Sequence, residues 1–118
     1  MSQEKLILVV DDEPSIRDFM RHTLETRAYG VDLAESGWEA LAKFDQRTYA
    51  AVILDIMMPR MSGTELATHL RAQEESELTP IILMSAVRNP ISIPNTIYLP
   101  KPFDIEHVLE LVTLLLPA

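Results

Sequence analysis

The chain has 118 residues, of which 47% are hydrophobic and 24% charged, and this length predicts one domain spanning residues 1–118 without room for a separate output domain. A net charge of −8 opposes direct binding to a nucleic-acid backbone, and no apolar run is long enough to span a membrane. The absence of cysteine and of a secretory signal pattern fits a cytoplasmic protein.

Short apolar runs alternate with amphipathic stretches along the chain. The runs are typical of strands in a mostly parallel sheet. The five predicted strands are residues 6–10, 31–34, 51–54, 81–84 and 96–99. Strands that alternate with helices indicate a doubly wound α/β sheet, in which functional groups gather at the carboxyl ends of the strands.

Helical patterns fill the first three connections between these strands. Pro14 suits a first helical position, and apolar residues then recur at helical spacing. Ser36 followed three residues later by Glu39 is a capping-box pattern at the start of a second helix. Ser62 or Gly63 opens a third helix. Each helix would carry the chain from one parallel strand to the next.

The regular alternation fails after the fourth predicted strand. Four prolines crowd the segment that should carry a fourth helix, namely Pro90, Pro94, Pro100 and Pro102. Proline lacks a backbone donor and restricts the residue before it, so a helix of normal length cannot form there. We expect a loop or a single turn at residues 88–95, which is either mobile or takes its conformation on contact with a partner.

The final segment, residues 104–116, is predicted to form a helix with Asp104 at its N-cap. Its apolar positions sweep about 220° of the helix surface, more than a one-sided surface helix needs. Part of this face should be exposed where the missing helix would have packed. We expect Leu111 and Leu114, which flank the arc, to contact a downstream protein or a second copy of the chain in a homodimer.

Three carboxylates follow two strands that are neighbours in a doubly wound sheet. Asp11 and Asp12 come directly after the first strand, and Asp55 after the third. Such a cluster repels itself unless a cation neutralises it, and Mg²⁺ prefers carboxylate, water and phosphate oxygens. Lys101 and Ser85 add an ammonium and a hydroxyl at the same edge. Together these groups could position a phosphoryl group and spread its charge during transfer to Asp55.

Each of these residues has a simpler interpretation when taken alone. Asp11 and Asp12 suit the N-terminus of the helix that follows them. Asp55 could be a turn residue, and Ser85 and Lys101 could be solvated loop residues. Their positions at the ends of four strands are what favour a shared site.

The chain resembles the receiver domain of bacterial response regulators over nearly its whole length. The resemblance rests on Asp11-Asp12, on the run Asp-Ile-Met-Met-Pro-Arg-Met-Ser-Gly at 55–63, on Ser85-Ala86 and on Lys101-Pro102-Phe103. It implies a stand-alone receiver with a flavodoxin-like, doubly wound, five-stranded parallel sheet in the order 2-1-3-4-5. The fourth helix would be missing or replaced by the proline-rich loop.

The resemblance also implies a magnesium-dependent phosphoacceptor. Asp55 would accept phosphate from a histidine kinase or a phosphotransfer protein. Asp12 and Asp55 would bind Mg²⁺ directly, with the backbone carbonyl of Met57, and Asp11 would contribute through water. Such a domain is a signalling protein that assists its own phosphorylation and slow dephosphorylation rather than an enzyme.

Further roles follow from the same resemblance. Ser85 and the backbone amide of Ala86 would hold the acyl phosphate, and Lys101 would bridge it. Tyr98 would be the aromatic residue that turns inward on activation. The bond between Lys101 and Pro102 is expected to be cis.

Three other functions are alternatives to a phosphoacceptor. An aspartyl-phosphate hydrolase needs a second aspartate two residues after the nucleophile, where this chain has Met57. A flavodoxin-like electron carrier needs a phosphate loop after the first strand, and the acidic residues 11–13 would repel a flavin phosphate. A receiver-like interaction module that is never phosphorylated stays open as an alternative.

The large side chains near these motifs are interpreted as packing residues. Trp38, early in the second predicted helix, is expected to pack rather than to bind a ligand. Met57, Met58 and Met61 are expected to fill gaps under the loop that follows the third strand. None of these side chains is predicted to contact a ligand.

Overall fold

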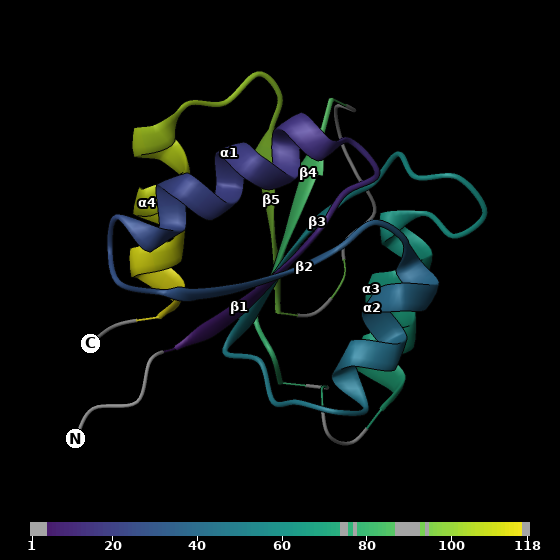
Figure 1. Cartoon of the computed structure of the whole chain (residues 1–118). Coiled ribbons are helices and arrows are strands. Elements are labelled where there is room, and N and C mark those ends of the chain that lie inside the picture. The colour runs from purple at the N-terminus through teal and green to yellow at the C-terminus, as the bar shows by residue number, and fades with distance from the viewer. Residues whose placement is uncertain (1–4, 74–75, 77, 87–92, 94, 117–118) are drawn as a thin grey trace.

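The computed structural model describes residues 5–73, 76, 78–86, 93 and 95–116. Figure 1 shows a central sheet with helices on both faces. The strands are β1 (Leu6–Val10), β2 (Gly30–Ala34), β3 (Ala51–Asp55), β4 (Ile81–Ser85) and β5 (Thr96–Pro100). The helices that the described residues form are α1 (Pro14–Glu25), α2 (Gly37–Phe44), α3 (Gly63–Ala72) and α4 (Ile105–Leu115). All strand pairs are parallel, in the order β2-β1-β3-β4-β5, which confirms the predicted fold.

The strands separate two hydrophobic cores because successive side chains point to opposite faces of the sheet. In β1, Leu8 and Val10 join the core under α2 and α3, whereas Ile7 and Val9 join the core under α1 and α4. Figure 1 shows the same division, with α1 and α4 on one face and α2 and α3 on the other. Every residue of β3 and β4 is buried, which explains their unbroken apolar sequences.

Hydrogen-bonded caps set the points at which the helices begin. Ser62 and Glu65 form a reciprocal capping box at the start of α3. The predicted capping box of α2 is only half formed: the Ser36 hydroxyl accepts from the Glu39 amide, but the Glu39 carboxylate accepts from the amide of Glu35 at 2.8 Å. These caps hold the helix N-termini beside the carboxyl edge of the sheet.

The segment between β4 and β5 lacks a helix as far as it is described. Its described residues are Ala86, Ile93 and Asn95, and none of them is helical. Ile93 packs against the core under α2 and α3. Arg71 of α3 donates to the carbonyl of Asn95 at 2.8 Å and so ties α3 to the start of β5. The predicted loop or turn at 88–95, including its mobility, falls largely outside the described residues.

The last helix matches its prediction. Asp104 caps α4 by accepting the His107 amide at 2.9 Å. Leu111 is half-buried against the core under α1 and α4, whereas Leu114 is 69% exposed. No helix formed by the described residues has the length and apolar character needed to cross a membrane.

Candidate functional site

The ends of four parallel strands bring the predicted site residues to one edge of the sheet. Asp11 follows β1 and donates its amide to the carbonyl of Ala34 at 3.1 Å. Asp55 is the last residue of β3, and Ser85 is the last residue of β4. Lys101 follows β5 and donates its amide to the carbonyl of Ser85 at 2.9 Å. The strand ladders therefore fix the backbone under each of these side chains.

The carboxylates of Asp11, Asp12 and Asp55 lie together as predicted. One oxygen from each falls within 4.8 Å of the others. Asp11 is fully buried and Asp55 nearly so, whereas Asp12 is exposed. The Oδ2 atom of Asp11 has no hydrogen-bond partner and is the only such buried side-chain atom among the described residues. A buried oxygen without a donor is costly, and a hard divalent cation is the partner that these donors fit.

The raised pKa of Asp11 also favours a cation at this cluster. The pKa of Asp11 is raised to about 6, chiefly by burial and also by the nearby charges of Asp55 and Asp12, although the Glu13 amide and Lys101 oppose the change. The Glu13 amide donates to Oδ1 of Asp11 at 2.9 Å. Near neutral pH this carboxylate therefore carries a charge that its surroundings do not fully compensate.

Two donors hold the carboxylate of Asp55. The ammonium of Lys101 lies 3.1 Å from Oδ1, and the amide of Met57 donates to the same atom at 3.2 Å. The peptide bond between Lys101 and Pro102 is cis, as the resemblance implied. Asp55 is only 4% exposed, and the two donors hold its carboxylate in a defined orientation.

A glycine allows α3 to begin directly beside Asp55. The amide of Gly63 donates to the carbonyl of Ile56 at 3.0 Å. A Cβ atom at this position would collide with the backbone carbonyl oxygen of Asp55. The glycine in the 55–63 run is therefore required by the close approach of the helix to the end of β3.

The remaining predicted residues lie around this centre. Ser85 is 4% exposed at the end of β4, and Ala86 is exposed beside Lys101 in a surface hollow. Tyr98 is half-buried in β5 against the core under α2 and α3, and burial raises its pKa. Leu114 lies on α4, away from the strand ends.

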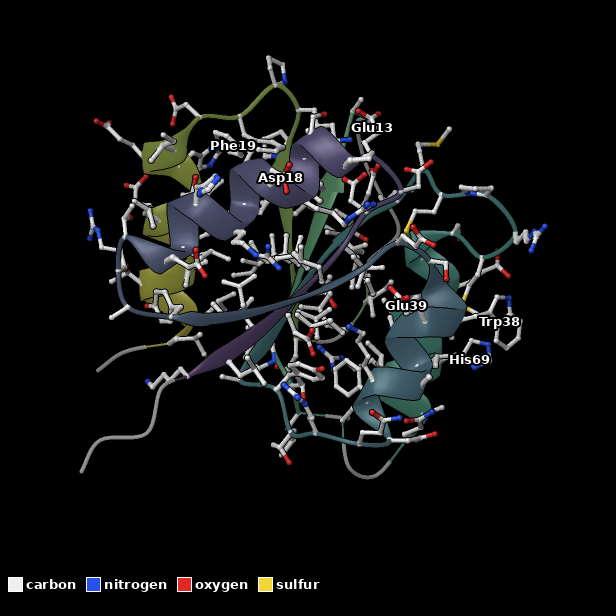
Figure 2. The ribbon with its side chains drawn as sticks, viewed as in Figure 1. Glu13, Asp18, Phe19, Trp38, Glu39 and His69 are labelled. Atoms are coloured by element: carbon white, nitrogen blue, oxygen red, sulfur yellow. The ribbon has the colours of Figure 1, made fainter. Side chains whose placement is uncertain are left out.

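The predicted packing roles of two large side chains are wrong. Trp38 is 62% exposed, because it occupies the outward face of the first turn of α2, and Figure 2 shows it projecting away from that helix. The side chain of Met57 is 72% exposed while its backbone amide holds Asp55. Met58 and Met61 are buried, as expected.

Sequence patterns did not identify an apolar groove that begins beside Lys101. One hollow, of about 560 Å³, is lined by Glu13, Ile16, Phe19, Ala86, Lys101, Pro102 and Phe103. A second hollow shares Phe19 and Phe103 and continues along the start of α4. The ring centroids of Phe19 and Phe103 are 6.1 Å apart, and Figure 2 shows Phe19 on α1 and Glu13 at the start of that helix. The groove joins Phe19 to Phe103, which are 84 residues apart in sequence, so sequence patterns could not reveal it. The only hint was Phe103, which belongs to the Lys101-Pro102-Phe103 motif.

Comparison with known proteins identifies the family. Residues 7–113 match the model of the response regulator receiver domain, and the chain belongs to that family. It is 38% identical over 117 residues to the response regulator MprA of Mycobacterium sp. (strain KMS), a match that covers 93% of this chain and 50% of MprA. The chain thus spans about half the length of this curated relative. Receiver domains act in two-component signalling and interact with histidine kinases or phosphotransfer proteins.

Solved structures share the whole fold. The chemotaxis protein CheY4 of Vibrio cholerae superposes with a TM-score of 0.90 at 33% identity, over 97% of this chain and 100% of that one. The response regulator TrrA of Thermotoga maritima, solved in complex with Mg²⁺-BeF, gives a TM-score of 0.83 at 40% identity, over 95% and 99% of the two chains. Receiver domains bind Mg²⁺ at an acidic pocket, and Asp11, Asp12 and Asp55 form that pocket here.

Proposed function

We propose that Asp55 accepts a phosphoryl group from the phosphohistidine of a histidine kinase or phosphotransfer protein, in a Mg²⁺-dependent reaction that switches the protein's contacts. One observation carries the proposal. The nearly buried carboxylate of Asp55 is held by Lys101 and lies beside Asp11, whose Oδ2 atom has no partner. An oriented acceptor next to an uncompensated anionic pocket is what phosphoryl transfer requires.

The reaction forms a bond between phosphorus and a carboxylate oxygen of Asp55 and breaks the bond between phosphorus and the histidine nitrogen. The product is an acyl phosphate, and the histidine leaves with its electron pair and takes up a proton. Lys101, already 3.1 Å from the acceptor, would bind an oxygen of the transferred group. Ser85 and the backbone amide of Ala86 would donate to its other oxygens.

The proposal includes the ligands of the metal, and the clustered carboxylates of Asp11, Asp12 and Asp55 support it. Asp12, Asp55 and the backbone carbonyl of Met57 would hold Mg²⁺, with Asp11 contributing through water. When bound, Mg²⁺ supplies positive charge to the phosphoryl oxygens. The chain has Met57 rather than a second acid two residues after Asp55, so turnover would be slow self-hydrolysis rather than enzymatic dephosphorylation.

The groove beside Lys101 is the surface that suits the phosphodonor. It begins at Lys101, the residue that contacts Asp55, and the apolar side chains of Ile16, Phe19 and Phe103 line it. Glu13 lies on its rim, and Asp104 and Glu106 line the hollow that continues it. A donor segment with apolar side chains and a basic rim would complement this surface in shape and charge.

The response to phosphorylation would involve β5 and α4. Tyr98, with Ser85, would change position on phosphorylation. Leu111 and Leu114 would then contact a downstream protein, or a second copy of the chain in a homodimer. The exposure of Leu114 supports this assignment, because a leucine of that exposure on an ordered helix is available for a partner.

The test is the intact mass of the protein after incubation with acetyl phosphate and Mg²⁺. We expect a gain of one phosphoryl group in the wild type and in the matched control Asp45→Asn, which alters an exposed aspartate at the end of α2. The gain should be absent in Asp55→Asn and when Mg²⁺ is chelated. A wild type that binds Mg²⁺ but gains no mass would favour the unphosphorylated interaction module instead.

A further inference from the structure

Arg17 reaches back from α1 to the turn that carries the first two aspartates. Its guanidinium donates through one terminal nitrogen to the backbone carbonyl of Asp11 at 2.7 Å. Arg17 lies one turn inside α1, and its side chain is half-buried. The contact therefore spans from the body of the helix to the residue that ends the β1 ladder.

This contact completes the restraint of Asp11. The amide of Asp11 is held by Ala34, and its Oδ1 atom accepts from the amide of Glu13. Arg17 donates to the carbonyl of Asp11. Of these three partners, Arg17 is the one that acts through its side chain. The carbonyl of Asp11 belongs to the same peptide plane as the amide of Asp12, so its orientation sets the direction in which both residues leave the strand.

We propose that Arg17 is a positioning residue for the cation site: it holds the peptide plane between Asp11 and Asp12 so that both carboxylates face Asp55. The inference rests on the proposed function, because it takes these carboxylates to be the ligands of a divalent cation. Groups that orient metal ligands contribute strongly to metal affinity without touching the metal. Arg17 acts in this way through the backbone, not through a ligand atom.

The sign of the effect separates this role from simple electrostatics. A cationic side chain near three carboxylates would weaken Mg²⁺ binding by repulsion, so its removal would tighten binding. A side chain that orients the ligands has the opposite effect, and its removal weakens binding. The two explanations therefore predict changes of opposite direction for the same substitution.

Arg21 offers a matched control on the same helix. It lies one turn beyond Arg17 and makes no hydrogen bond or ion pair with any other described residue. Arg21→Met removes the same charge from the next turn of the same helix without removing the contact to Asp11. Arg17→Lys keeps the charge but replaces the planar fork by a shorter, compact ammonium.

The experiment is a calorimetric titration of each variant with Mg²⁺ alone. We expect Arg17→Met to raise the Kd for Mg²⁺ about tenfold and Arg17→Lys to raise it about threefold. Arg21→Met should stay within about twofold of the wild type or bind slightly more tightly. The Mg²⁺ concentration that gives half-maximal phosphorylation by acetyl phosphate should shift by the same factors, which a loss of stability alone would not produce.

The proposed function and the role of Arg17 would fail in distinguishable ways. A wild type that does not bind Mg²⁺ would overturn the proposed function. A wild type that binds Mg²⁺, alongside an Arg17→Met variant that binds it equally or more tightly, would overturn only the role of Arg17. If Arg17→Met does not fold by circular dichroism, Arg17→Lys decides, and a wild-type affinity in that variant overturns the inference.

Discussion

Asp11 directly follows β1 and Asp32 lies in the neighbouring strand β2, yet the surroundings of the two aspartates differ in kind. Asp32, in β2, accepts from the hydroxyl of Tyr49 at 2.6 Å and from the ammonium of Lys43 at 3.0 Å. Burial opposes its charge, but these donors outweigh burial and hold the pKa of Asp32 below its usual value. Asp11 has only the Glu13 amide on one oxygen and none on the other, and burial raises its pKa to about 6.

The contrast separates Asp32, whose paired carboxylate stabilises the fold, from Asp11, whose carboxylate belongs to the acidic pocket. A fully paired carboxylate strengthens the folded state, whereas an unpaired buried one weakens it until a proton or a cation arrives. Burial accounts for part of the difference, because Asp11 is fully buried and Asp32 only partly so, and the donors around Asp32 account for the rest. The unpaired one lies at the carboxyl edge, where the ligand site of this fold is expected.

The largest effect should come from Asp11→Asn in the metal-free protein. A carboxyl group whose pKa is higher in the folded than in the unfolded state destabilises the protein as pH rises between the two values. A rise from 3.8 to about 6 corresponds to on the order of 3 kcal/mol. Urea unfolding at pH 8 should therefore show Asp11→Asn to be more stable than the wild type by up to that amount.

The pH dependence provides the check on this prediction. Below about pH 3 the Asp11 carboxyl group is largely neutral in both the folded and the unfolded state, so the gain should vanish. Asp45→Asn, which removes an exposed charge, should show no such pH-dependent gain. An Asp11→Asn variant that is less stable than the wild type at pH 8 would contradict the assignment of Asp11 as an uncompensated charge.

Asp32→Asn should act in the opposite direction. Asparagine cannot offer Lys43 a charged partner, and we expect a loss of about 2 kcal/mol at pH 7. Because the folded-state pKa of Asp32 is lowered, its contribution is present at neutral pH and is lost as pH falls through that lowered value. Urea unfolding at pH 7 and in acid should show the difference from the wild type shrinking. A difference that is constant with pH would mean that lost packing, not charge, causes the effect.

The sequence predicts the sheet to within one residue at each strand end, and the physical reason is plain. Both faces of β3 and β4 are buried, so their sequences are continuous apolar runs that leave little choice of boundary. The carboxylate cluster is predictable for a related reason. Each residue lies at the end of a strand or within two residues of it, and topology alone brings the strand ends together.

The features that escape prediction depend on which way a side chain turns in the fold. The exposure of Trp38 depends on how α2 is rotated against the sheet, and the contact of Arg17 with Asp11 depends on a side chain folding back along α1. The groove joins Phe19 to Phe103 across a long stretch of sequence. Periodicity locates a helix and its apolar stripe, but it carries no information on these tertiary contacts.

Tyr49→Phe tests one of the two close donors of Asp32 separately. Tyr49 is 3% exposed, and its ring packs against that of Phe44 with centroids 5.1 Å apart. Phenylalanine should keep this packing and lose only the hydrogen bond, for a cost of about 1 kcal/mol in urea unfolding. In combination with Asp32→Asn the two costs should not add, because Asp32→Asn weakens the charge-assisted bond that Tyr49→Phe removes. Full additivity would show that the bond contributes nothing.

Arg47→Met should have the smallest effect, although Arg47 also points a charge at Asp32. Its guanidinium lies 3.8 Å from Oδ2, and its side chain is 59% exposed. An exposed ion pair at that distance is screened by water and salt and offset by the entropy of ordering a long side chain, so we expect a change below about 0.5 kcal/mol. Raising the salt concentration should remove even this difference. A loss as large as that of Tyr49→Phe would mean that Asp32 needs all three donors and that its low pKa is a property of the network, not of the two close contacts.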